Sequence, residues 1–392
     1  MQTEDSTGKP NRIMTLDVLK GILMIGIVMV HLVFLAGTDA PVDLITPSDT
    51  GEVRPGLSSP IYIQMLYLGM MMFFISSGYF FRPKRSAKEN ILRRVKQLII
   101  PIVVGLIVLP TILYVYLTLL GQGPTWEDLY PSYKAVLGGV LVFQPYTGYD
   151  PSIIVGMCFV YNGYYFLQLM LVAFVLFYLL ADKVLDDLKK LIISIVVLIA
   201  CTALLVEFVN MRLPFYAQLS PLAAAFMLFG AAIGKKGLVE WLEASSLKNP
   251  KLWVFFIVSL ALGALMVFVL PTGTGFDAMV FGDYGGWSAY SYFIAAVFTN
   301  MALLFLGSLI ARIPLLNKAL ATAGRHSIAI ICLHIFVIKL MMAPFHELMS
   351  TYTFPVTPIG ESVVYWLVAV IVIVLVAEYV PKLIQKRKES KE

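Results

Sequence analysis

Long apolar blocks are the feature that most constrains how this chain can fold. Many of them run for roughly 18 residues or more with few charges, and a helix needs about 20 such residues to cross the hydrocarbon core of a bilayer. Hydrophobic residues make up 59% of the chain and charged residues only 14%, against about 45–50% and about 25% in an ordinary soluble domain. A water-soluble core does not need blocks of this length. The sequence therefore predicts an all-α, polytopic membrane protein.

Hydropathy divides the chain into a cytoplasmic N-tail (1–12), an integral membrane domain (13–381) and a basic C-tail (382–392). The first apolar run is longer than that of a signal peptide and contains charges, so we expect it to be retained as a membrane helix. About ten membrane helices are predicted in all. They are expected at 13–36, 61–81, 97–120, 157–180, 191–209, 216–234, 252–270, 288–311, 326–343 and 359–381.

The distribution of lysine and arginine predicts the orientation of these helices. If the N-terminus lies inside, the inner segments hold 24 of the 29 lysines and arginines, and the outer loops hold three. Positive residues concentrate in cytoplasmic loops, so both termini are predicted to be cytoplasmic. The net charge of +5 then reflects topology and attraction to anionic membrane lipids. No basic surface suited to nucleic acid is left over, and none of the three cysteines forms a CxxC pair that would suggest a metal site.

Three ionisable residues fall inside the first predicted helix: Asp17, Lys20 and His31. Placing a charge inside a bilayer costs free energy, so a charged residue there usually has a structural or functional role. Asp17 and Lys20 are spaced so that they can pair on one helix face. His31 lies eleven residues after Lys20, which places it about 20° from the same direction and about 16 Å further along the helix.

Simpler interpretations of these residues stay open. Lys20 could be an interfacial anchor whose amine reaches the polar headgroups. His31 could be a packed histidine that hydrogen-bonds another helix, although a neutral imidazole can also serve as a base near pH 7. His334, in the middle of a predicted helix, fits a structural role and a functional role equally well.

Four segments, taken in order, resemble the membrane acyltransferase-3 family. The first carries Asp17 and Lys20 and reaches His31; the family usually has arginine where this chain has Lys20, and lysine there resembles its fucose 4-O-acetylase-like branch. A second block contains Ser77 and precedes a basic loop, a third contains Tyr164, and the last ends at His334. The four segments read Leu16-Asp17-Val18-Leu19-Lys20-Gly21 followed by His31, Phe73-Phe74-Ile75-Ser76-Ser77-Gly78-Tyr79-Phe80-Phe81, Tyr164-Tyr165-Phe166-Leu167, and Gly324-Arg325-His326-Ser327-Ile328 through Leu333-His334.

The resemblance implies an enzyme of the bacterial cytoplasmic membrane that moves an acyl group, expected to be acetyl, from acyl-CoA to a hydroxyl of a sugar or surface glycan. No tightly bound cofactor or metal is expected. His31 is the candidate base for the acceptor hydroxyl. Lys20 is expected to bind the donor or, with Asp17, to orient the site, and Ser77, Tyr164 and His334 are possible pocket residues. The arginines of the predicted basic loop 82–96 suit the phosphates of CoA, or serve only topology and lipid anchoring. They are Arg82, Arg85, Arg93 and Arg94.

A transporter or flippase is the alternative function. An intramembrane group of aspartate, lysine and histidine could relay protons instead of catalysing acyl transfer. Transporters often contain interrupted helices in two matching halves, and the sequence does not have that pattern. We therefore favour the enzyme.

Overall fold

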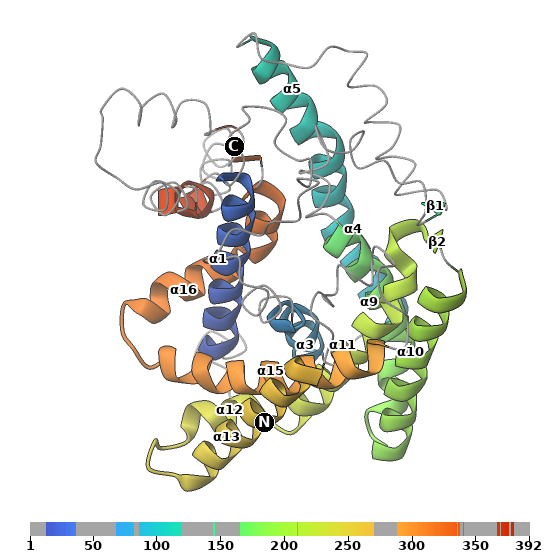
Figure 1. Ribbon diagram of the computed structural model, residues 1–392, viewed down its shortest axis with the longest axis vertical. Coiled ribbons are helices and arrows are strands. Elements are labelled where there is room, and N and C mark those ends of the chain that lie inside the picture. Colours follow the sequence, from blue (N-terminus) through green and yellow to red (C-terminus); the bar gives the residue numbers. More distant parts are fainter. Residues whose placement is uncertain are drawn as a thin grey trace, which may run out of the picture.

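The computed structural model describes residues 13–36, 68–81, 86–119, 144–145, 165–209, 211–269 and 288–334, with short pieces between 336 and 379. Both predicted tails, the predicted outer loop 37–60 and most of the outer loop 121–156 lie outside the described residues. Figure 1 shows the arrangement of the described helices.

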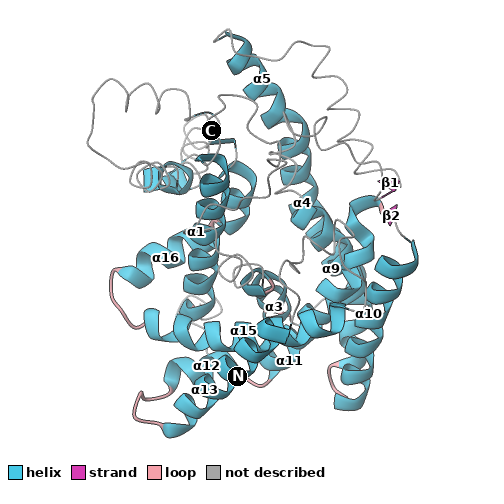
Figure 2. Ribbon diagram, in the orientation of Figure 1, coloured by secondary structure: helices cyan, strands magenta, loops and turns pink. Residues whose placement is uncertain are grey.

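The described part of the chain is helical, which confirms the all-α class (Figure 2). Its two strands are two residues each, β1 (Gln144–Pro145) and β2 (Met211–Arg212), paired antiparallel. The helices, in chain order, are α1 (Met14–Ala36), α3 (Met72–Tyr79), α4 (Ala87–Val103), the π-helix η1 (Val104–Val108), α5 (Leu109–Leu119), α9 (Tyr165–Val184), α10 (Leu188–Val209), the 3-10 helix η2 (Pro214–Leu219), α11 (Ser220–Lys235), α12 (Leu238–Ala244), α13 (Pro250–Val269), α15 (Ser288–Ile310) and α16 (Leu316–Arg325).

Four of the described helical segments are long and apolar enough to cross a membrane. They are 166–184, 188–208, 214–235 and 289–310, and two shorter apolar helices cover 68–79 and 250–266. All six coincide with segments that hydropathy predicts as membrane helices. The chain is thus a multi-pass membrane protein, while the total of ten helices and the cytoplasmic position of the termini stay predictions.

Residues 87–96 of the predicted basic loop 82–96 are helical, contrary to the expectation from hydropathy. Helix α4 begins at Ala87 with a capping box, in which the Ser86 hydroxyl accepts from the Glu89 backbone N–H at 3.3 Å and the Glu89 side chain accepts from the Ser86 N–H at 3.2 Å. Its first turns are charged, so a search for apolar blocks finds only the later part. Pro101 lies within α4, and a π-helical turn joins α4 to α5.

Two further short helices lie in segments that the sequence analysis treats as inner loops. Helix α12 (Leu238–Ala244) lies within 235–251, and α16 (Leu316–Arg325) lies within 312–325. Each has ten residues or fewer and is too short to span a bilayer. Hydropathy windows chosen for membrane spans therefore do not detect either helix.

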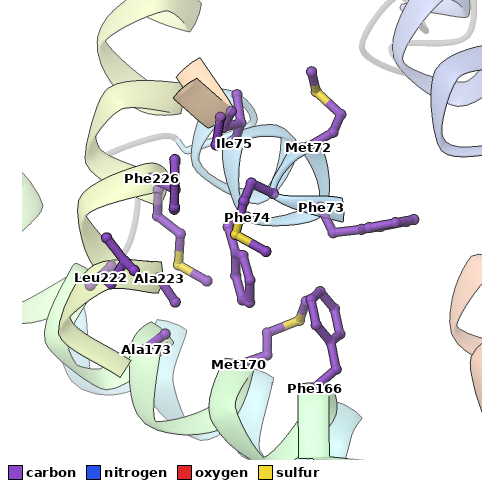
Figure 3. Packing of buried hydrophobic residues seen from close by; sticks show 14 of the residues in the cluster. Met72, Phe73, Phe74, Ile75, Phe166, Met170, Ala173, Leu222, Ala223 and Phe226 are labelled. Atoms are coloured by element: carbon purple, nitrogen blue, oxygen red, sulfur yellow. The ribbon is translucent and has the colours of Figure 1, made fainter. Parts of the chain in front are cut away.

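Helix α3 packs closely against α11, and its phenylalanines meet Phe166 of α9 in the hydrophobic core (Figure 3). The Phe74 and Phe166 rings lie 4.7 Å apart between centroids, and Phe226 of α11 is also fully buried. A Cβ atom added at Gly78 would lie 1.9 Å from the backbone oxygen of Met227. Glycine there lets the two helix backbones touch, as small residues do between membrane helices.

Candidate functional site

Asp17 and Lys20 form an ion pair in the first turns of α1. The Lys20 Nζ lies 3.1 Å from the Asp17 Oδ1, and the exposed fractions of the two side chains are 17% and 8%. The i, i+3 spacing on one helix places the two groups on the same face, as the sequence predicts. A carboxylate in the first turn also lies close to the positive end of the helix dipole. The structure thus has a partly buried lysine whose charge is balanced by its own helix.

The Lys20 amine approaches the end of α3. Its Nζ lies 6.0 Å from the centroid of the Phe80 ring, at the outer limit of a cation–π contact. Phe80 directly follows α3 and is 42% exposed. The amine therefore lies beside an open aromatic side chain from the second family-like block.

Helix α16 covers the same part of α1, and the two lie side by side in Figure 1. A Cβ atom at Gly21 would lie 2.0 Å from the Leu320 backbone oxygen, and one at Gly324 would lie 1.8 Å from the Asp17 backbone oxygen. The helices therefore touch backbone to backbone at the Asp17–Lys20 pair. Three segments far apart in the sequence, around Lys20, Phe80 and Gly324, meet at one place.

Tyr79, the last residue of α3, makes two hydrogen bonds to residues of α12. Its hydroxyl accepts from the Val239 backbone N–H at 3.1 Å and donates to the Glu240 Oε2. Glu243, one turn further along α12, accepts from the Thr15 backbone N–H at 2.8 Å. Helix α12 thus contacts both helices that meet at Lys20.

His31 lies on α1, which runs as one helix from Met14 to Ala36. Position 31 therefore falls on the same face of a continuous helix as Lys20, about 16 Å further along it. The side chain of His31 lies outside the described residues, as do Arg82, Arg85 and Tyr164. Their roles stay predictions.

His334 is buried, with 1% of its surface exposed. Its Nδ1 lies 2.8 Å from the Ile330 oxygen and 2.9 Å from the Ile331 oxygen. Carbonyl oxygens only accept hydrogen bonds, so Nδ1 must carry the proton. In the neutral ring Nε2 is then an acceptor, the form that a base requires.

Arg93 and Arg94 differ in their surroundings although both were predicted to bind the donor. Arg94 packs against α9: its Nε donates to the Tyr178 hydroxyl at 3.3 Å, and its guanidinium carbon lies 4.8 Å from the centroid of the Phe174 ring. Arg93 is exposed on α4. The structure therefore gives Arg94 a packing role and leaves Arg93 exposed at the surface of α4.

Ser77, predicted as a pocket residue, uses its hydroxyl within its own helix. The Oγ donates to the Phe73 backbone oxygen at 2.7 Å, and the Oγ of the neighbouring Ser76 donates to the same oxygen at 3.1 Å. Serines that bond back to the preceding turn satisfy their own polar group inside an apolar helix. This contact explains how α3 tolerates two adjacent serines.

The sequence alone does not identify Tyr79, Glu240 and Glu243 as residues of this region. Tyr79 was noted only as part of a family-like block. The hydrogen bonds that join it to α12 span 160 residues or more, and no local pattern predicts contacts of that range. The capping box at Ser86 and Glu89 was visible in the sequence as a serine followed three residues later by glutamate.

Comparison with known proteins gives one match that covers nearly the whole chain. A family model described as an acyltransferase domain matches residues 14–378. No curated protein and no solved structure matches the chain significantly. The matched region includes α1, α3 and α16, which meet at Lys20, and α12, which contacts α1 and α3.

Proposed function

The chain belongs to the acyltransferase 3 family, and on that premise we propose that it transfers an acyl group from acyl-CoA to a hydroxyl of a sugar or surface-glycan acceptor. Membership in the family makes it a membrane acyltransferase. The acyl-CoA donor, the acetyl group, the glycan acceptor and a bacterial inner-membrane location are parts of the proposal. Lys20, in the position where the family usually has arginine, supports the fucose 4-O-acetylase-like branch.

The single observation that supports this proposal best is the meeting of three segments at Lys20. The Asp17–Lys20 pair of α1 lies against Gly324 of α16 and beside Phe80 at the end of α3. These three belong to the four segments that resemble the family. Their convergence, although Lys20 and Gly324 are 304 positions apart in the sequence, is expected of an active site.

The chemistry of acyl transfer suits this arrangement. A thioester is a good acyl donor, but an alcohol is a poor nucleophile until a base removes its proton. In the proposed reaction His31 takes that proton, the acceptor oxygen bonds to the acyl carbon, and the carbon–sulfur bond breaks to release CoA. Lys20 supplies a fixed positive charge on the same helix face for the donor, and Asp17 holds the lysine in place.

Replacing His31 with glutamine tests the proposal in purified protein reconstituted into vesicles. Glutamine can keep a hydrogen bond but cannot take a proton at neutral pH. We expect kcat to fall by about 10²-fold or more while acyl-CoA binding is retained. His346→Gln, in a predicted outer loop, is the matched control and should keep full activity.

Two results would contradict the proposal. Near-normal turnover by His31→Gln would make His31 a structural hydrogen-bonding residue and direct the search for a base to His334. A wild-type protein that turns over no acyl-CoA with any hydroxyl acceptor, but moves a solute together with protons, would instead support the transporter.

A further inference from the structure

Helix α12 has seven residues and would not be stable alone, because isolated helices of that length are marginal in water. Side chains from other helices complete both of its ends. The Tyr79 hydroxyl of α3 accepts from the Val239 N–H at the beginning of α12. Arg312, just after α15, donates to the Leu242 and Ser245 oxygens at 2.9 and 2.8 Å at its end. These backbone groups have no partner within a helix, so α12 is fixed by α3 and α15.

Helix α12 in turn completes the N-terminus of α1. The Glu243 carboxylate accepts from the Thr15 N–H at 2.8 Å, one of the first N–H groups of α1, which have no partner within the helix. A negative charge also interacts favourably with the N-terminus of a helix. Glu243 therefore holds α1 by a contact that α1 cannot make for itself.

Glu240 and Glu243 lie one turn apart on α12 and bind two different helices. Glu240 accepts from the Tyr79 hydroxyl of α3, and Glu243 accepts from Thr15 of α1. Residues spaced i, i+3 share a helix face. One face of α12 thus joins the beginning of α1 to the end of α3.

Both contacts lie next to Lys20 and Phe80 along the chain. Thr15 precedes Lys20 by little more than one turn of α1, and Tyr79 directly precedes Phe80. A helix is rigid over one or two turns. Holding Thr15 and Tyr79 in place therefore also holds the Lys20 amine relative to the Phe80 ring.

We propose that Glu240 and Glu243 are positioning residues of the acyltransferase: α12 ties α1 to α3 and holds Lys20 where acyl transfer needs it. The inference rests on the proposed function of the site. Neither glutamate touches the reacting atoms in this scheme. Each acts through the helix that it binds.

The link that α12 makes between α1 and α3, here called the tie, can be tested without any substrate through the accessibility of position 20. A Lys20→Cys variant is treated with a water-soluble maleimide, and the labelling of the native cysteines is measured in the parent chain and subtracted. Adding Glu243→Ala should speed labelling at position 20 by about fivefold or more, since local opening exposes groups that packing protects. Glu243→Gln keeps an oxygen that accepts from Thr15, so it should leave the rate within about twofold.

Activity is then measured in variants that retain Lys20. Glu243→Ala should lower kcat/KM by about tenfold, within the range seen when contacting residues are uncoupled, and Glu243→Gln should restore most of it. Tyr79→Phe removes a single hydroxyl and should act in the same direction, which keeps the test valid if Glu243→Ala does not fold. Tyr116→Phe is the matched control, because it removes the hydroxyl of a tyrosine in α5 that donates to the Leu340 backbone oxygen, away from α12.

The outcomes separate this proposal from the proposed function. If Lys20→Cys is labelled at the same rate with and without Glu243→Ala, and with and without Tyr79→Phe, the tie is overturned, whatever the enzyme does. Faster labelling with unchanged kcat/KM makes α12 a structural element only and also overturns the positioning role. A wild type without acyl-CoA turnover contradicts the proposed function, and the positioning role with it, while the labelling rates still report the contact itself.

Discussion

Gly324 of α16 packs directly on the backbone of Asp17: a Cβ atom at position 324 would lie 1.8 Å from the Asp17 oxygen. Real Cβ atoms do not approach a carbonyl oxygen so closely, so any other residue at 324 must push the two helices apart. Asp17 forms the ion pair with Lys20. The glycine is therefore required for the geometry of the candidate site as well as for packing.

Gly324→Ala should destabilise the protein by about 1–3 kcal/mol, the usual cost of overpacking, and should lower activity more than stability because the Asp17–Lys20 pair is displaced. Gly307→Ala in α15 is the control, since its Cβ would meet its nearest neighbour at 3.4 Å, an ordinary contact distance. Thermal unfolding in detergent and acyl transfer in vesicles measure the two effects. Equal behaviour of the two variants would contradict the tight contact between α1 and α16.

Removing one partner of the Asp17–Lys20 pair should destabilise the protein more than removing both. Lys20→Met leaves the Asp17 carboxylate, with only 8% of its side chain exposed, without its lysine. Breaking a fully buried ion pair costs about 3–5 kcal/mol of stability. The loss here should be smaller, because the Lys20 side chain is partly exposed. The double variant Asp17→Asn, Lys20→Met should recover much of that stability.

Activity of the same double variant decides whether the pair is only structural. If Lys20 acts on the donor, the double variant folds but stays inactive, and Lys20→Arg, which keeps the charge, retains activity. Measurement of unfolding temperature and acyl-CoA turnover on the same preparations separates these effects. A stable and fully active double variant would remove Lys20 from the functional site.

Arg93 and Arg94 should respond differently to substitution by glutamine. Arg93 is exposed, so Arg93→Gln should leave stability nearly unchanged and, if α4 binds CoA phosphates, raise the KM for acyl-CoA and its sensitivity to salt. Arg94→Gln loses the contacts with Tyr178 and Phe174 and should lower the unfolding temperature as well. The KM for the acceptor is the internal control, and it should stay constant. If Arg93→Gln changes neither KM, this helix has no part in donor binding.

The orientation in the membrane follows from the charge distribution and can be measured directly. Reporter fusions between residues 82 and 86, and at the C-tail, should report cytoplasm. Fusions within 37–60 and 121–156 should report the outside, because lysine and arginine are concentrated in the first set of segments. A C-tail found outside would contradict the ten-helix topology.

The positions of the long helices could be predicted from the sequence alone. The predicted segments 191–209 and 288–311 correspond to α10 (Leu188–Val209) and α15 (Ser288–Ile310). Apolar length is a local property, so it can be recognised without a structure. The pairing of Asp17 with Lys20 was equally predictable, because a helix fixes the geometry of residues three positions apart.

The tertiary structure alone decided which segments meet Lys20 and what each charged residue does there. Arg93 and Arg94 are indistinguishable in the sequence, yet one is exposed and the other packs on α9. Glu243 is an ordinary inner-loop residue in the sequence, yet it completes the first turn of a helix 228 positions away. The physical reason is range: hydropathy and helical spacing act within one segment, whereas the contacts that build the site join segments that only the folded chain brings together.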